Sequence, residues 1–203
     1  SPGVIELVEA LCATGQAQCV LGNHELSVLR GAAKPGNGWF FADNHDHAAG
    51  RFQDCRAASR DQRRQFPQFL AGLPLALSRD DLRVVHAAWH PASLMALAAD
   101  AGSQPLTDIY REYGRRSEQW AQESALRHAA GAEYKDWGKQ LNDEHASVPL
   151  LQAIGRMDEH FQMSNPVRVL TSGMEQLASR TFYASGKWRM VERVAWWDDY
   201  QDP

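Results

Sequence analysis

The sequence is poor in cysteine and has no long apolar run. Its cysteines form a sparse, odd-numbered set: Cys12, Cys19 and Cys55. Small secreted domains built on disulfides carry more cysteines, so we expect reduced thiols and a cytoplasmic protein. No apolar stretch reaches the length that spans a bilayer, and the first residues lack the charged and apolar regions of a signal peptide. We therefore expect no membrane partner.

An excess of positive charge is also absent. The chain has 21 Lys and Arg against 25 Asp and Glu, a net charge of −4 at pH 7. This balance offers no bulk attraction to nucleic acid, and we expect no nucleic-acid partner. An anionic substrate would need positive charge concentrated locally by metal ions or arginines. Internal repeats, a P-loop and a nucleophile elbow are missing too, and the composition suits one packed domain over residues 1–203.

What the sequence does contain is a polar block that follows a short apolar run. Cys19–Leu21 is expected to be a buried strand that ends at Gly22, with a helix from His24 to Arg30. Asn23 and His24 would then lie at the carboxyl end of a strand, where ligands bind in open α/β sheets. Asn offers a hard amide oxygen that suits divalent cations, and His can donate a proton near neutral pH. The alternative is an ordinary strand-to-helix turn whose polar residues are caps.

A second histidine follows another strand-like run. Leu82–Val85 ends in two β-branched valines, is expected to pair with Leu73–Leu77 as a hairpin, and delivers His86 at its end beside two small residues. A lone histidine at such a position is more often a satisfied core residue. Together with the block at Asn23, however, it becomes a candidate metal ligand. His90 is better explained as a cap of the helix that begins near Pro91.

The segments Gly22-Asn23-His24-Glu25 and Val85-His86-Ala87 together resemble the signature of the calcineurin-like metallophosphoesterases. The resemblance is to the branch of serine/threonine phosphatases and bacterial diadenosine tetraphosphatases. It implies an α/β fold, a calcineurin-like mixed β-sandwich flanked by helices. It also implies that Asn23 and His86 ligate one of two divalent metal ions (Mn, Fe or Zn), and that His24 acts on the leaving oxygen. The implied substrates are phosphoproteins, dinucleoside polyphosphates or small phosphomonoesters.

The sequence departs from that family mildly at Ala88, where glycine is usual, and more strongly in two other respects. The family places an Asp-x-His block and a Gly-Asp-x-x-Asp-Arg-Gly block ahead of its Gly-Asn-His-Glu segment, and neither precedes Gly22 here. We therefore expect an N-terminal truncation, with a short degenerate relative as the alternative. A strand expected at Val167–Leu170 leads to Gly173-Met174, where the family has Gly-His, and a thioether is a poor ligand for these cations. Either Glu175 substitutes for this ligand, or the site is altered or lost. A catalytically eroded relative that acts as a scaffold or interaction protein is therefore a second hypothesis.

Other segments carry weaker signals. Helical periodicity from about residue 91 to 160 predicts a large helical insertion, which as a lid over the site would select the substrate. Asp43–His47 is rich in metal-ligand types but lacks ligand spacing, so a solvated loop is favoured. The arginines that follow it fit the solvated face of a helix that ends near Gly72 and buries Phe66, Phe69 and Leu70. We also expect a helix over Pro2–Ala13 and a C-terminal hairpin formed by Thr181–Ala184 and Trp188–Val194.

Overall fold

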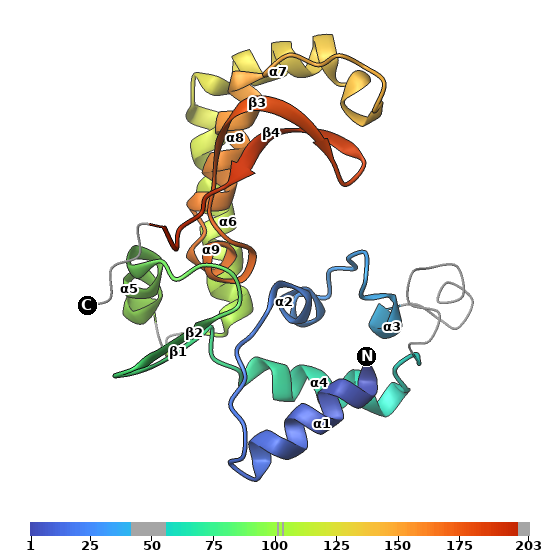
Figure 1. Ribbon diagram of the computed structural model, residues 1–203, viewed down its shortest axis with the longest axis vertical. Helices are drawn as coiled ribbons and strands as arrows, with labels where there is room; N and C mark the ends of the chain where they lie inside the picture. Colours follow the sequence, from blue (N-terminus) through green and yellow to red (C-terminus); the bar gives the residue numbers. More distant parts are fainter. Residues whose placement is uncertain (42–55, 101, 103, 199–203) are drawn as a thin grey trace. The chain divides into compact units, whose positions relative to one another are not determined.

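The computed structural model describes residues 1–41, 56–100, 102 and 104–198 (Figure 1). Within them the chain divides into two compact units. The first unit comprises residues 1–87 and 105–107, and the second comprises residues 88–104 and 108–203. Helices and small antiparallel sheets occur in both, so the protein is broadly α/β. No helix in the described part of the chain has the length and apolar character needed to cross a membrane.

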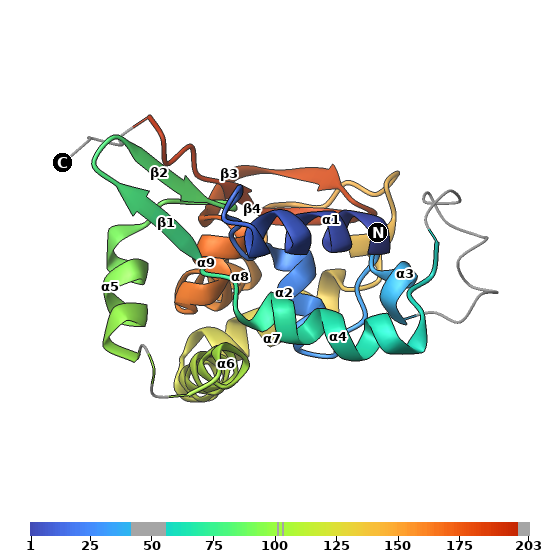
Figure 2. The same cartoon turned by 90° about the horizontal axis from the view of Figure 1, so that it is seen from below.

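The first unit is built from short helices and one hairpin. Its elements are α1 (Pro2–Ala13), α2 (Asn23–Leu29), α3 (Gly38–Phe41), α4 (Arg60–Ala71), β1 (Ala76–Arg79) and β2 (Leu82–Val85). In both views α1 lies alongside α4 (Figure 1 and Figure 2). The helix expected over Pro2–Ala13 is confirmed, with proline in its first turn, where a missing N–H costs nothing.

Helix α4 shows why this unit has a core. Ser59 and Gln62 form a reciprocal capping box that starts the helix. Phe66 and Leu70, one turn apart, are 1% and 2% exposed, as expected from their spacing. On the outer side Arg64 pairs with Asp61 at 2.7 Å, which agrees with a solvated face.

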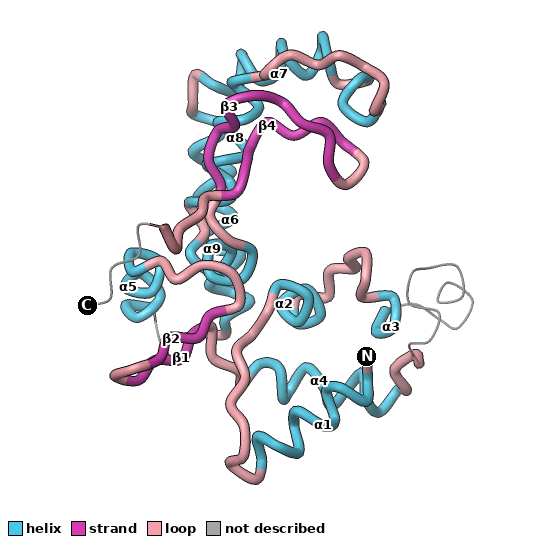
Figure 3. The backbone as a smooth tube through the Cα atoms, in the orientation of Figure 1, coloured by secondary structure: helices cyan, strands magenta, loops and turns pink. Residues whose placement is uncertain are grey.

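The hairpin at Leu82–Val85 is confirmed, with Ala76 opposite Val85, although β1 begins later than expected. The strand expected at Cys19–Leu21 is wrong. The segment is drawn as loop in Figure 3, and the described residues contain no ladder for it. Leu21 is nevertheless fully buried, and its N–H donates to the carbonyl of Pro74 at 2.8 Å. One backbone bond therefore satisfies the buried donor without a neighbouring strand.

The second unit is mostly helical. Its elements are α5 (Pro91–Asp100), α6 (Leu106–Glu123, whose first residues belong to the first unit), α7 (Leu126–Trp137), the 3₁₀ turn η2 (Gln140–Asn142), α8 (Gln152–Met163), α9 (Pro166–Ser172), β3 (Glu175–Ala184) and β4 (Lys187–Arg193). The predicted helices between residues 91 and 160 are thus present. The predicted C-terminal hairpin is also present, as the longer pair β3–β4, and α8 packs against it. Val148, Leu151 and Met190 form the buried centre of this packing.

The strand expected at Val167–Leu170 is also wrong, because these residues lie in α9. Asn165 caps the helix by accepting the Arg168 N–H at 3.3 Å, and Pro166 occupies the first helical position. The strand was expected because the run is apolar and β-branched, whereas in the structure Val167, Val169 and Leu170 are fully buried in a helix. Cap chemistry together with burial outweighs the β preference of the branched side chains.

Candidate functional site

The polar block of the sequence forms the start of α2. Gly22 is its N-cap, with extended backbone angles, and the Gly22 carbonyl accepts the Leu26 N–H at 2.9 Å. Asn23 is therefore the first residue of the helix, and its backbone carbonyl accepts a bond from the Ser27 hydroxyl. The Asn23 side chain is half-buried. Its amide group has no hydrogen-bond partner among the described residues.

His86, far away in the sequence, lies against this turn. A Cβ placed on Gly22 would lie 2.7 Å from Cε1 and 2.8 Å from Nδ1 of the His86 ring. It would also lie 2.6 Å from a carboxylate oxygen of Glu25. Both side chains therefore approach the Gly22 backbone more closely than any other residue at position 22 would allow. The structure thus brings His86 to the turn that presents Asn23.

His24 has a partner that the sequence did not indicate. Its Nδ1 lies 2.9 Å from Oδ1 of Asn37, and the Asn37 amide nitrogen donates to the His24 carbonyl at 2.8 Å. Asn37 is 1% exposed, so this contact is shielded from water. The sequence suggested turn chemistry for residues 34–38. A buried asparagine inside a turn produces no periodic pattern, so the sequence does not mark Asn37 as a contact of His24.

The metal-binding capacity of the turn is limited. The hard or borderline donors near Gly22 are the Asn23 amide oxygen, the Glu25 carboxylate and the His86 imidazole, a set that suits one divalent cation. The described residues contain no group of three or more His, Cys, Asp or Glu side chains that could hold a metal ion.

The remaining predicted residues have other surroundings. Met174 belongs to the second unit, is half-buried, and its carbonyl accepts the Val194 N–H. Glu175, its suggested substitute, pairs with Arg193 at 3.5 Å. That Met174 lies beside Asn23 stays a prediction. His90 immediately precedes α5: its carbonyl accepts the Leu94 N–H at 3.1 Å and its Nδ1 lies 2.8 Å from the Ser93 hydroxyl, while burial lowers its pKa. The segment Asp43–His47 lies outside the described residues.

Two other features were considered as sites. A cavity of about 450 Å³ in the first unit is lined by residues that include both Cys12 and Cys19. Burial raises the pKa of the Cys19 thiol, so it stays protonated and is a poor nucleophile at neutral pH.

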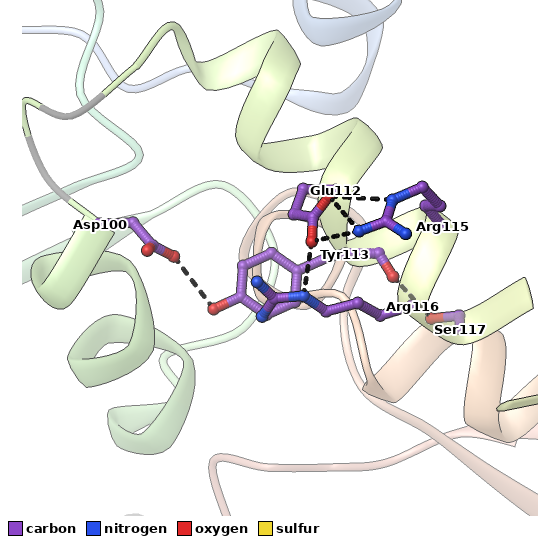
Figure 4. A network of polar contacts seen from close by, with 6 residues as sticks. All are labelled: Asp100, Glu112, Tyr113, Arg115, Arg116 and Ser117. Atoms are coloured by element: carbon purple, nitrogen blue, oxygen red, sulfur yellow. Dashed lines mark hydrogen bonds and ion pairs between the residues drawn. The ribbon is translucent and has the colours of Figure 1, made fainter. Parts of the chain in front are cut away.

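On α6 a polar network surrounds Glu112, which accepts bonds from Arg115 and Arg116 at 2.8 Å each (Figure 4). The Tyr113 hydroxyl donates to Asp100 in the same network. These two guanidinium groups already have an internal carboxylate, so the network attracts a free anion less than two unpaired arginines would.

Comparison of the chain with models of protein families, with curated proteins and with solved structures gave no match. The interpretation of the Gly22 turn therefore depends on the residues and distances described above and on the sequence motif.

Proposed function

We propose that the chain carries part of the active site of a metal-dependent phosphoesterase of the calcineurin-like type. The observation that supports this proposal best is the contact of the His86 imidazole with Gly22, beside Asn23 and Glu25. Two segments far apart in the sequence, chosen for their resemblance to one family's metal ligands, meet at one turn. The parent fold would be the mixed β-sandwich with a helical insertion that the resemblance implies.

In this proposal each side chain has a distinct task. Asn23 and His86 would hold one metal ion through a neutral oxygen and an imidazole nitrogen. The metal pair (Mn, Fe or Zn) would supply an activated water and neutralise charge on the phosphoryl oxygens of a phosphoprotein, dinucleoside polyphosphate or small phosphomonoester. His24 would give its ring proton to the leaving oxygen. Since Nδ1 is engaged by Asn37, the nitrogen available for this transfer is Nε2.

The 203 residues bring few charged ligands to this site. The carboxylates of the family's Asp-x-His and Gly-Asp-x-x-Asp-Arg-Gly blocks, which would bridge and complete the metal pair, do not precede Gly22 in these residues. Neutral ligands compensate poorly for the dehydration of a divalent cation. We therefore expect the chain to bind Mn²⁺ with a Kd on the order of 10⁻⁴–10⁻³ M, in the range of weakly charged oxygen sites. Turnover of p-nitrophenyl phosphate should accordingly be slow.

The test is a titration of the ¹⁵N-labelled chain with Mn²⁺, a paramagnetic ion that broadens NMR signals near its binding site. We expect early broadening of the Gly22 and Asn23 amides and of the His86 ring. Asn23→Ala and His86→Ala should each weaken this effect several-fold, whereas His128→Ala, at an exposed histidine of α7, should not change it. Broadening that starts elsewhere, or that survives both substitutions, would mean that the metal assignment is wrong.

One observation favours the second candidate, a catalytically eroded relative that acts as a scaffold. Glu175, which could have replaced the family's last histidine, is 17% exposed and is engaged by Arg193. Together with Met174 this leaves the corresponding part of the site without an obvious ligand. If the folded chain shows no localised Mn²⁺ broadening at the Gly22 turn, the scaffold becomes the better interpretation.

A further inference from the structure

We propose that Asn37 is a positioning residue that fixes the tautomer and orientation of the His24 ring. The role of His24 itself depends on the proposed function, but the action of Asn37 on the ring does not. The two residues are joined by two hydrogen bonds, one to the ring and one to the backbone of the same histidine. Such a double contact holds both the ring and the chain that carries it.

The two bonds together determine which atom donates. The Asn37 NH₂ group donates to the His24 carbonyl at 2.8 Å, and a carbonyl oxygen can only accept. This orients the amide so that its oxygen faces Nδ1 of His24 at 2.9 Å, and an amide oxygen also only accepts. Nδ1 must therefore carry the hydrogen. In the neutral ring Nε2 is then the unprotonated nitrogen, available as a base, and it becomes the acidic N–H when the ring is protonated.

Asn37 is itself held in place. Its N–H donates to the Lys34 carbonyl at 2.9 Å, and its carbonyl accepts the Phe40 N–H at the start of α3. Trp39, two residues after Asn37, is 8% exposed, and its ring centroid lies 6.3 Å from that of Phe66 in α4. A buried amide that is fixed on both its backbone and side-chain groups loses little additional freedom when it binds the ring.

An asparagine differs from an aspartate in this place. A carboxylate would also accept from Nδ1, but it would have no hydrogen to give to the His24 carbonyl. The neutral amide serves both contacts and adds no charge next to Asn23. The geometry therefore points to a device that selects one ring nitrogen for chemistry, Nε2, without an ion pair.

The test reads the tautomer directly, without metal and without turnover. In the ¹⁵N-labelled full chain, at a pH where the ring is neutral, we expect His24 to show Nδ1 as the pyrrole-type and Nε2 as the pyridine-type nitrogen. His128, which is exposed, serves as the internal reference and should show the opposite preference. Asn37→Leu removes both bonds and should reverse the His24 pattern. Asn37→Asp keeps an acceptor for Nδ1 and should retain that pattern.

The wild-type spectrum alone can overturn the proposal. A His24 ring with its hydrogen on Nε2 would show that Asn37 does not select the tautomer, whatever the variants do. If Asn37→Leu folds and leaves the His24 pattern unchanged, Asn37 has only a structural role through the backbone bond. Failure of the Mn²⁺ titration with the expected tautomer would refute the proposed function and leave this inference standing.

Discussion

The two units use their polar side chains differently. In the second unit such groups hold the structure together: Glu133 of α7 accepts the N–H groups of Ala153 and Ile154 at the start of α8. Gln162 of α8 donates to the Gly173 carbonyl at 2.6 Å, and the Asn165 amide donates to the Tyr110 carbonyl at 3.0 Å. At the Gly22 turn of the first unit, by contrast, the side chains of Asn23 and His86 have no hydrogen-bond partner among the described residues.

The difference follows from where each group lies. A buried polar group without a partner costs about 1–3 kcal/mol, so Gln162 and Asn165, both nearly inaccessible to water, need internal partners. Asn23 is half-buried and His86 is exposed, so water can solvate both until a ligand replaces it. We infer that the two candidate metal ligands, Asn23 and His86, are polar residues that the fold leaves to water, whereas His24 is held by Asn37.

The largest effect should come from removing the core beneath the first unit's polar residues. Phe66→Ala deletes a ring that is 1% exposed and packs near Trp39, and core phenylalanine truncations cost about 3–5 kcal/mol. Urea unfolding of the variant, followed by amide exchange at residues 20–41, should show this loss in the first unit. Phe69→Ala, at a half-exposed position of the same helix, is the matched control and should cost clearly less. Equal losses would place the core of this unit elsewhere.

A pair of glycines should separate packing from helix propensity in the second unit. Gly155 of α8 leaves room for β4, because a Cβ there would collide with the Leu177 side chain and lie 3.0 Å from the Met190 carbonyl. Gly155→Ala should destabilise by about 1–3 kcal/mol, as overpacking does. Gly131 of α7 has open space around it. Gly131→Ala should stabilise by about 0.5–1 kcal/mol through helix propensity. Thermal unfolding that shifts in one direction for both variants would contradict this assignment.

The helix cap that Glu133 provides should contribute somewhat less to the free energy of unfolding than the packing at Gly155 does. Glu133→Ala leaves the N–H groups of Ala153 and Ile154 without this acceptor, and the loss of a helix cap costs about 0.5–2 kcal/mol. Glu118→Ala, at an exposed position of α6, removes the same charge without a cap and is the matched control. Chemical unfolding of the two variants should differ by about 1 kcal/mol. Identical curves would show that solvent replaces the carboxylate fully.

Much of the architecture could be predicted because its signals are local. Helix α1 was predicted at its observed bounds from proline and apolar spacing, and the C-terminal hairpin from its two strand-like runs. Val167–Leu170 resembles a strand in the sequence because a short apolar, β-branched run is compatible with both a strand and a buried helix. The sequence Asn165-Pro166 is a helix-start signal, and this signal indicates a helix rather than a strand over the residues that follow.

The sequence motif pointed to both His86 and the Asn23 block, but the structural reason for their proximity differs from the expected one. His86 and the Asn23 block were each expected at the end of a strand, yet Cys19–Leu21 belongs to no described sheet. They meet because Gly22 lacks a side chain and because the Leu21–Pro74 backbone bond ties the two segments of the unit. Asn37 could not be foreseen, since its contact with His24 depends on the tertiary placement of a turn.

The smallest effect on stability should come from Gly22→Ala. This variant directly tests whether the polar side chains at Gly22, unlike those of the second unit, contribute little to stability. The backbone angles at Gly22 are compatible with alanine, so the substitution adds no backbone strain. The added methyl group would instead meet a carboxylate oxygen of Glu25 and the His86 ring, at 2.6–2.8 Å. Neither side chain has an internal partner to lose among the described residues, so both should swing into water at a cost within about 0.5 kcal/mol. NMR should then show changed His86 ring shifts in a fold of nearly unchanged stability. A loss of several kcal/mol would mean that these side chains hold the first unit together, as Glu133 and Gln162 do in the second.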